Sequence, residues 1–350
     1  MQDPSFWPTV LSRLVSGESL TADESAEAML AIMREEATPV QVAGFLMALR
    51  AKGETAAEIE GFARAALEMA RPVRPTVPVV DTCGTGGDRS GTFNISTLGA
   101  IVVAACGVAV AKHGNRAASS LCGSADLLET LGVRIDLDPP GVERCIAEAG
   151  IGFMFAPVFH PAAAYAAGIR RELRVPTVFN FLGPLTNPAR PSAQVVGVSD
   201  PRMLPLLAEV LARRGVRAMV VRGADGLDEL TTTGPSTVVE VRDGETHEVV
   251  LDPSELGLAP ARPEDLRGGD AETNARIARE VLSGVRGPHR DVVVLNAAAA
   301  LEVAGRASTL ADGLTLAADV VDSGAAAAAL ERWIAVSWDA AGGEGRRAER

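Results

Sequence analysis

The chain has 350 residues, which suggests about two domains of ordinary size. Hydrophobic residues make up 47% of it, enough for a substantial core, and 33 Lys and Arg against 45 Asp and Glu give a net charge of -12. A chain this acidic is a poor general binder of nucleic acid or anionic membranes, so an anionic substrate would need positive charge concentrated in its own site.

The cysteines and the apolar runs indicate a cytoplasmic protein without a membrane partner. The four cysteines show neither a CxxC pair nor His-rich spacing, which favours buried thiols in a reducing cytoplasm over a disulfide or a zinc site. The first ten residues lack the basic and apolar segments of a signal peptide. No apolar run reaches the ~20 residues of a membrane span.

Helix-start signals fill residues 1–72. In a capping box, a threonine hydroxyl and a Glu or Gln side chain three residues later each satisfy an otherwise unpaired backbone N–H. Three pairs fit this pattern: Thr21 with Glu24, Thr38 with Gln41, and Thr55 with Glu58. Gly53 is a suitable end for the second helix. We expect an α-helical domain here that serves packing or association rather than chemistry.

Apolar runs and helical patterns then alternate, which predicts an α/β domain with a mostly parallel central sheet. The predicted strands are Val77–Val80, Val108–Ala111, Ile151–Phe155, Val195–Val198 and Met219–Val221. The predicted helices start at Ser96, at Ser124 and after Pro140, or span 161–174 and 201–213. Ser236–Leu251 is a predicted hairpin that turns at Asp243-Gly244, and the remainder to about residue 337 is Ala-rich and helical.

We assign the α/β domain to residues 73–160 and 186–338, joined to the helical domain by a Pro-interrupted linker at 71–76. A helical segment near 161–185 is expected to pack on the helical domain, and residues 339–350 are expected to form a loose tail.

The stretch Asp81–Asn94, DTCGTGGDRSGTFN, lies between a predicted strand and a predicted helix. In that order the backbone N–H groups of the loop and of the helix start converge on one point. Gly84, Gly86 and Gly87 can adopt positive φ and let an anion come close to the backbone. A phosphate or pyrophosphate fits such a loop, and a plain turn is the alternative. The spacing matches neither a P-loop nor a dinucleotide-binding motif.

A second candidate anion site is the turn Lys112–Arg116, which follows a predicted strand and runs into two serines. Lysine supplies a point charge, and arginine supplies a two-pronged donor for phosphate. The alternative is an ordinary cationic loop. Ser124, just beyond, is expected to be the N-cap of the next helix, with ligand contact as an additional role.

Two carboxylates and one arginine complete the candidate groups. Asp228 and Glu229 follow the strand predicted at Met219–Val221, and adjacent carboxylates in such a place suit Mg²⁺, which bridges them to substrate phosphates. A solvated acidic loop is the alternative. Arg170 would either pair with a substrate carboxylate or lie on a solvated helix face. The sequence has no HExxH or GxSxG motif and no context typical of a nucleophilic cysteine.

Together these segments resemble the anthranilate phosphoribosyltransferases, of the nucleoside phosphorylase-like phosphoribosyltransferase family, over about residues 5–338. The resemblance rests on GTGGD at Gly84–Asp88, NIST at Asn94–Thr97, KHGNRAASS at Lys112–Ser120, GSAD at Gly123–Asp126, FNFLGPLTNPAR at Phe179–Arg190 and DGLDEL at Asp225–Leu230. It implies a small α-helical domain beside a larger α/β domain, an active site in the hinge cleft, and a homodimer joined through the helical domain. It also implies transfer of the 5-phosphoribosyl group from phosphoribosyl pyrophosphate to the amino group of anthranilate, in tryptophan biosynthesis, with two Mg²⁺ ions per monomer.

The resemblance further implies which residues contact each ligand. Phosphoribosyl pyrophosphate would contact Gly84, Gly87, Asp88, Thr92, Asn94, Ile95, Ser96, Thr97, Lys112, His113, Gly114, Asn115, Arg116, Ala117, Ala118, Ser119, Ser120 and Ser124. Mg²⁺ would contact Ser96, Asp228 and Glu229, and anthranilate would contact Gly84, Asn115 and Arg170. An aromatic amine is already nucleophilic, so positioning can replace a strong base, and no residue is assigned a catalytic role beyond binding.

One segment departs from the family pattern, and two other functions stay open at this point. The segment His160–Gly168 is smaller and more Ala-rich than the family's, which carries a Met after His-Pro-Ala and a Pro before the arginines, so the shape of the acceptor end is undetermined. A pyrimidine nucleoside phosphorylase shares a similar KHGNRxxSSxxGSAD, but its first loop resembles TGGVGDK rather than GTGGDRSGTFN. A non-enzymatic, nucleic-acid-binding relative is disfavoured by the net charge of -12.

Overall fold

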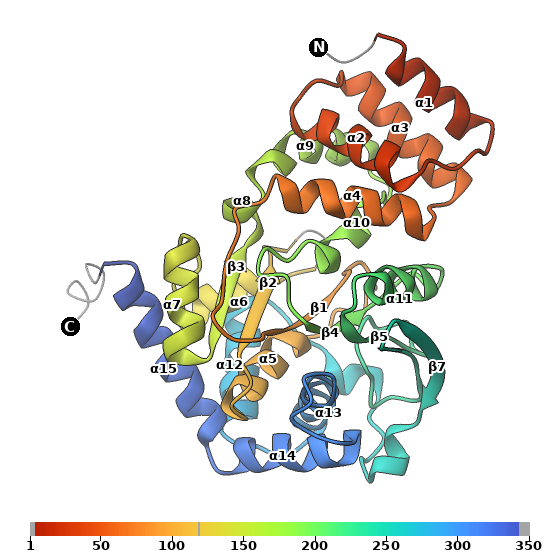
Figure 1. The fold of residues 1–350 in the computed structure, drawn as a ribbon. Helices are drawn as coiled ribbons and strands as arrows, with labels where there is room; N and C mark the ends of the chain where they lie inside the picture. The colour runs from red at the N-terminus through yellow and green to blue at the C-terminus, as the bar shows by residue number, and fades with distance from the viewer. Residues whose placement is uncertain (1–3, 118–119, 343–350) are drawn as a thin grey trace.

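The computed structural model describes residues 4–117 and 120–342. It consists of an N-terminal bundle of helices beside a larger α/β part built on one sheet (Figure 1). The fold class expected from the sequence is therefore confirmed.

The three predicted capping boxes start three of the four helices of the bundle. These helices are α1 (Phe6–Val15), α2 (Ala22–Met33), α3 (Pro39–Lys52) and α4 (Ala56–Glu68). At each predicted start the threonine hydroxyl accepts the N3 backbone N–H, and the N3 side chain accepts the threonine N–H. Gly53 ends α3 with φ 91°, as predicted. Inside the bundle, the Phe45 ring packs edge-on against Trp7 and Phe62, with centroids 5.7 and 5.8 Å away.

A later segment of the chain shares the core of the bundle. It contains α8 (Ala156–Phe159), η1 (Pro161–Ala163), α9 (Ala164–Leu173), α10 (Phe179–Leu182) and η2 (Gly183–Leu185). Ala166, Phe181 and Leu182 belong to the same buried cluster as the bundle side chains. The Tyr165 hydroxyl donates to the Ala37 carbonyl oxygen at 2.6 Å and so ties α9 to the turn before α3.

The sheet has seven strands in the order β3-β2-β1-β4-β5-β6-β7. The strands are β1 (Val80–Gly84), β2 (Val110–Gly114), β3 (Ile151–Phe155), β4 (Ala193–Gly197), β5 (Arg217–Gly223), β6 (Ser236–Arg242) and β7 (Glu245–Leu251). The first five run parallel, and β6 and β7 form the predicted antiparallel hairpin. The strand order reverses between β1 and β4, which is the place where α/β sheets bind ligands outside their carboxyl ends.

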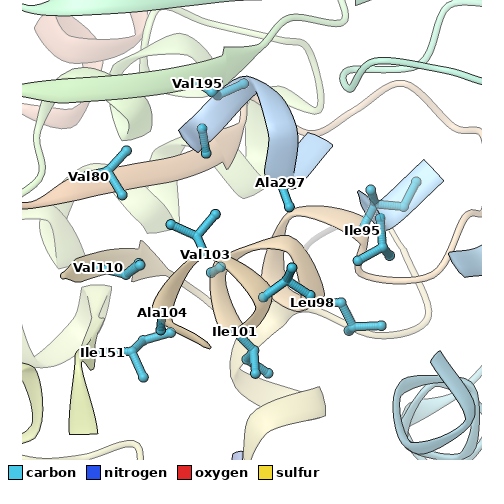
Figure 2. Packing of buried hydrophobic residues seen from close by; sticks show 14 of the residues in the cluster. Val80, Ile95, Leu98, Ile101, Val103, Ala104, Val110, Ile151, Val195 and Ala297 are labelled. Atoms are coloured by element: carbon cyan, nitrogen blue, oxygen red, sulfur yellow. The ribbon is translucent and has the colours of Figure 1, made fainter. Parts of the chain in front are cut away.

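Helices cover both faces of the sheet. One face packs on α5 (Ile95–Ala105) and α13 (Pro288–Val303), where strand valines meet Val103 and Ala297 (Figure 2). The other face packs on α11 (Met203–Arg213) and on the bundle. The remaining helices are α6 (Ser124–Leu131), α7 (Pro139–Ala149), η3 (Pro253–Leu256), η4 (Pro263–Leu266), α12 (Ala271–Leu282), α14 (Leu310–Asp322) and α15 (Ala325–Ala340).

Strand β1 and helix α15 differ from their predicted boundaries. Strand β1 begins at Val80 rather than Val77, which is 47% exposed, because the sheet continues through the buried polar residues Asp81 and Thr82. Helix α15 continues to Ala340, into the start of the predicted tail, and the tail's last eight residues lie outside the described part of the chain. In the described residues no single helix is long and apolar enough to span a membrane; by length and composition alone, the pair α14 and α15, bent by 71°, passes as a broken span.

The crossing of α2 and α4 predicts a steric effect on stability. Gly61 in α4 faces α2 so closely that an added Cβ would overlap the Ala22 carbonyl oxygen and lie 2.7 Å from the Ser25 Cβ. We expect Gly61→Ala to lower the free energy of unfolding by about 1–3 kcal/mol through overpacking, measured by urea denaturation. Gly44→Ala in α3 is the control, because its Cβ would find its nearest neighbour at 3.7 Å and should stabilise by up to about 1 kcal/mol. Equal effects of the two substitutions would contradict the steric argument.

Candidate active site

The segments singled out in the sequence meet at one edge of the sheet. Strands β1 and β2 pair in parallel from Val80 and Val110, so the glycine loop and the cationic turn leave the sheet at the same end. Gly84 at the end of β1 is in register with Gly197 at the end of β4. The loop that carries Asp228 and Glu229 follows β5, which lies beside β4. The three segments are therefore brought together at the point where the strand order reverses.

Asp228 packs directly against the ends of β1 and β4. A Cβ on Gly84 would overlap its carboxylate, and a Cβ on Gly197 would overlap its carbonyl oxygen. The Gly86 N–H donates to Oδ2 of Asp228 at 2.6 Å. Gly84, Gly86 and Gly87 were expected to be able to adopt positive φ, and of the three only Gly86 and Gly87 do, at 69° and 83°. Gly84 instead provides room for the carboxylate.

Glu229 lies at the amino end of α5. The Ser96 backbone N–H donates to Oε1 of Glu229 at 3.2 Å, and the Ser96 hydroxyl also hydrogen-bonds to this carboxylate. Burial raises the pKa of Glu229 to about 7, although the charge of Lys112 lowers it. Burial and the neighbouring charges of Glu229 and Asp88 raise the pKa of Asp228 well above its usual range. The charged form of both carboxylates is therefore disfavoured, and Lys112 favours it only at Glu229.

A divalent cation would favour the charged form of Asp228 and Glu229. Oδ2 of Asp88 is buried and has no hydrogen-bond partner, and Asp88 contributes to the raised pKa of Asp228. Within the described residues, no three His, Cys, Asp or Glu side chains are arranged to hold a metal ion by themselves. Mg²⁺ commonly takes one or two carboxylates and completes its shell with substrate phosphates and water. Asp228, Glu229 and the Ser96 hydroxyl match that ligand set.

Lys112 is a buried counter-ion at the base of the site. Its side chain is 2% exposed, and Nζ donates to the Thr82 carbonyl oxygen at 2.6 Å. Burial raises the pKa values of Glu229 and Asp81, and the charge of Lys112 opposes this at both. On the sheet, the Asn187 side-chain amide donates to Asp81 at 2.8 Å and to the Ala111 carbonyl at 2.8 Å, which joins β1 to β2.

The guanidinium of Arg116 is already engaged. It pairs with Asp126 at 2.9 Å and with Glu129 at 2.8 Å, and it lies over the Phe155 ring at 5.6 Å. An anion that bound Arg116 would compete with these two carboxylates. The prediction placed Ala118 and Ser119 in the same site, and both lie outside the described residues.

The expectation that Ser124 is an N-cap is wrong by one residue. Gly123 is the N-cap of α6, and Asp126 accepts both its N–H and that of Ala117 at 2.9 Å. The Ser124 hydroxyl instead donates to the Asn115 carbonyl oxygen at 3.2 Å. This bond holds the cationic turn against the start of α6.

Several other residues predicted to contact the substrate are hydrogen-bonded or buried within the protein. Thr92 is paired with Arg267 in an isolated bridge, and the Asn94 side chain joins the Cys122 carbonyl at 3.1 Å to Asn274 at 2.9 Å. Ile95 and Thr97 are buried, and their backbone N–H groups donate to the carbonyl oxygens of Phe93 and Asn94, so neither residue faces the site in this structure. Ser120 donates to the Cys122 carbonyl at 3.3 Å.

Arg170 is an unpaired, partly buried cation near the bundle. Its guanidinium lies over the Phe179 ring at 5.2 Å, and burial lowers its pKa. No carboxylate in the described part of the chain pairs with it. Phe179 starts α10, and Gly183 directly after α10 accepts a hydrogen bond from His113, so one short segment joins Arg170 to the cationic turn.

His113 and His160 form a partly buried pair that the sequence did not reveal. Their ring centroids are 5.0 Å apart, and Nε2 of each is buried without a partner. Nδ1 of His113 lies 3.3 Å from the Gly183 carbonyl oxygen, which fits the neutral ring with its proton on Nδ1. Burial and His160 lower the pKa of His113 to about 3. The His-Pro that follows α8 was a visible signal, but only the fold shows that it meets His113.

Comparison with known proteins gives consistent matches along the chain. The helical bundle domain model of a glycosyl transferase family matches residues 8–70, and the a/b domain model of such a family matches residues 76–327. An anthranilate phosphoribosyltransferase from Arthrobacter sp. is 56% identical, over 95% of this chain and 96% of the relative. The crystal structure of the Thermus thermophilus anthranilate phosphoribosyltransferase has a TM-score of 0.89 and 49% identity, over 94% of this chain and 99% of that one. The Saccharomyces cerevisiae enzyme, 29% identical over 96% and 99%, has been solved with PRPP and Mg (TM-score 0.88) and with 4-fluoroanthranilate (0.84).

The lowered pKa of His113 predicts acid sensitivity. A histidine near its usual pKa of ~6.5 in the unfolded chain gains a proton below that pH, whereas the folded residue does not until about pH 3. The contribution of His113 to the free energy of unfolding is therefore complete above about pH 6.5, and it falls by roughly 2 kcal/mol at about pH 5. Urea denaturation at two pH values should show a smaller loss in His113→Gln than in the wild type. His247→Gln, on exposed β7, serves as control; an unaltered pH dependence in His113→Gln would refute the assignment.

Proposed function

The chain belongs to the anthranilate phosphoribosyltransferases, and we propose that its glycine loop, its cationic turn and Asp228 with Glu229 together bind 5-phosphoribosyl pyrophosphate. The enzyme transfers the phosphoribosyl group to the amino group of anthranilate, a step of tryptophan biosynthesis. The observation that carries the proposed site is the packing of Asp228 between Gly84 and Gly197. Because of that packing, the carboxylates and the backbone N–H groups of the loop lie close together.

The diphosphate is assigned to the donors around this point. The residues proposed to bind it are those of the glycine loop and α5 start (Gly84, Gly87, Asp88, Thr92, Asn94, Ile95, Ser96, Thr97), those of the cationic turn and the chain after it (Lys112 to Ser120), and Ser124. The Gly86 and Ser96 N–H groups now donate to Asp228 and Glu229. Donors of this kind bind phosphate at a helix start, so substrate binding would exchange carboxylate partners for phosphate oxygens.

Asp228, Glu229 and Ser96 are the proposed Mg²⁺ ligands, with two ions per monomer. Bound Mg²⁺ supplies positive charge that stabilises the negative charge growing on the departing pyrophosphate. The buried carboxylates would in turn lose their mutual repulsion when a cation lies between them. Lys112 neutralises part of the same charge from beneath.

Arg170 is the proposed partner of the anthranilate carboxylate, with Asn115 and Gly84 beside the amine. An arginine that has no internal carboxylate is free to form a two-pronged bond with a ligand carboxylate. Because an arylamine is nucleophilic without deprotonation, its placement next to the ribose would supply most of the rate gain.

We further assign residues 1–72, with the segment near 161–185 packed on them, to one domain and residues 73–160 and 186–338 to the other. A homodimer formed through the bundle accounts for its exposed large apolar side chains, which lie on α1 and α3: Val15, Val40 and Met47. A monomeric mass in light scattering would contradict this. The four free thiols, three of them buried, suit the cytoplasm.

Asp228→Asn tests the metal assignment. The amide keeps an acceptor for the Gly86 N–H but removes the charge, so we expect the Mg²⁺ concentration that gives half-maximal activity to rise at least about tenfold, a loss of about 1.4 kcal/mol. Calorimetric titration of PRPP at fixed Mg²⁺ should show a parallel loss of affinity. Asp243→Asn, in the exposed β6–β7 turn, is the control. An unchanged Mg²⁺ requirement would exclude Asp228 as a ligand.

Arg170→Gln tests the acceptor assignment. Loss of a charge-assisted bond of roughly 1.5–3 kcal/mol should raise the KM for anthranilate about 10- to 100-fold and leave the KM for PRPP unchanged. Arg171→Gln, at the exposed neighbouring position, should change neither value. If both variants had the wild-type KM for anthranilate, Arg170 would not be its carboxylate partner.

A further inference from the structure

Both backbone groups of Gly86, in the glycine loop, are hydrogen-bonded. Its N–H donates to Asp228, and its carbonyl oxygen accepts the Ser199 hydroxyl at 2.7 Å. The Ser199 N–H donates to the Thr85 hydroxyl oxygen at 3.1 Å, and the Thr85 and Ser199 hydroxyl oxygens lie 3.2 Å apart. Ser199 follows β4, and nothing in the sequence marked it. It holds the carbonyl of the Gly86–Gly87 peptide, the peptide directly after the one whose N–H donates to Asp228.

The next residue, Asp200, is bound by the helical bundle. Nη2 of Arg50, on α3, donates to Oδ2 of Asp200 at 3.1 Å, and Arg202 pairs with the same oxygen at 2.7 Å. Arg202 and Arg50 hold the pKa of Asp200 well below its usual range. The Arg50–Asp200 pair is mostly shielded from water, with side chains 20% and 19% exposed, and Arg50 also lies over the Phe181 ring at 5.6 Å. Such a pair is held more firmly than an exposed one.

A second ion pair crosses between the same two parts of the molecule but does not reach the loop. Nε of Arg214, at the end of α11, pairs with Glu60 on α4 at 2.7 Å, and its Nη1 donates to the Leu185 carbonyl oxygen at 2.7 Å. Neither Arg214 nor Glu60 bonds to residues 84–88. Substitutions in the two pairs can therefore be compared: both weaken the attachment of the bundle, but only a substitution in Arg50–Asp200 also affects the loop.

We propose that Ser199 and Asp200 are positioning residues that couple the bundle to the phosphate loop, through the chain of contacts Arg50–Asp200–Ser199–Gly86. Helix α9, which carries Arg170, packs in the core of the bundle. The same contacts therefore link the proposed anthranilate site at Arg170 to the proposed diphosphate site at the glycine loop. A shift of the bundle would move Asp200 and Ser199 and turn the Gly86–Gly87 peptide, which follows the N–H that donates to Asp228. The inference rests on the proposed binding of PRPP by this loop.

The test is a double-mutant cycle on PRPP affinity, measured by calorimetry with Mg²⁺ and without anthranilate. Ser199→Ala and Arg50→Gln should each weaken binding about 3- to 10-fold, the range for loss of one net hydrogen bond. Because both interrupt one chain of contacts, the double variant should lose little more than the weaker-binding single variant. Glu60→Gln should bind PRPP within about twofold of wild type, although it and Arg50→Gln should both lower Tm.

Three results would overturn the coupling. One is wild-type affinity in Ser199→Ala; another is a double variant whose loss equals the product of the single losses. The third is a loss of affinity in Glu60→Gln as large as in Arg50→Gln, which would show that bundle attachment in general is what matters. Asp228→Asn distinguishes this failure from failure of the proposed site: if it binds PRPP as wild type does, the site assignment is wrong, and if it alone is weakened, only the coupling is wrong.

Discussion

The site depends on one packing constraint: the Asp228 carboxylate and backbone fill the space that two glycines leave open at the switch point of the sheet. Gly84 and Gly197 are register partners on adjacent parallel strands, and a side chain on either would displace Asp228. The carboxylate is thereby fixed beside the Gly86 N–H, and Glu229 beside the Ser96 N–H. Glycine has two separate uses here, since Gly86 and Gly87 provide positive φ while Gly84 and Gly197 provide space.

This packing has an electrostatic cost that suits a metal-dependent transferase. Burial disfavours the charged form of a carboxylate, and it is the main cause that raises the pKa values of Asp228 and Glu229, with nearby acidic groups adding to it. Lys112 offsets only part of that charge, because it also serves the buried Asp81. In the proposed site a cation would bind the carboxylates, and phosphate oxygens would accept the N–H groups that the carboxylates release. Metal and diphosphate would then bind together more favourably than either would alone.

Local signals in the sequence predicted local structure, and tertiary partners decided the rest. The capping boxes at Thr21, Thr38 and Thr55 need only residues within one turn, so they were predicted correctly. Strand β1 was placed three residues early because Asp81 looks like a loop residue until Asn187, far along the chain, is seen to bind it. Ser124 was misassigned because Asp126 takes over the capping of α6. Ser199 and the His113–His160 pair were missed because their partners come from other elements.

The Ala-rich segment at 160–168, which differs from the family pattern, packs against the bundle. Ala166 lies in the bundle core, and the Tyr165 hydroxyl binds the Ala37 carbonyl, so the small residues let α9 lie close against α2 and α3. Arg170 is therefore positioned by the bundle, whereas Asp228 and the phosphate loop are positioned by the sheet. If the two substrates bind to these two parts as proposed, they can react only when the parts keep a fixed position relative to each other. The shielded ion pairs Arg50–Asp200 and Arg214–Glu60 provide that relation, and the first of them ends one residue from the serine that holds Gly86.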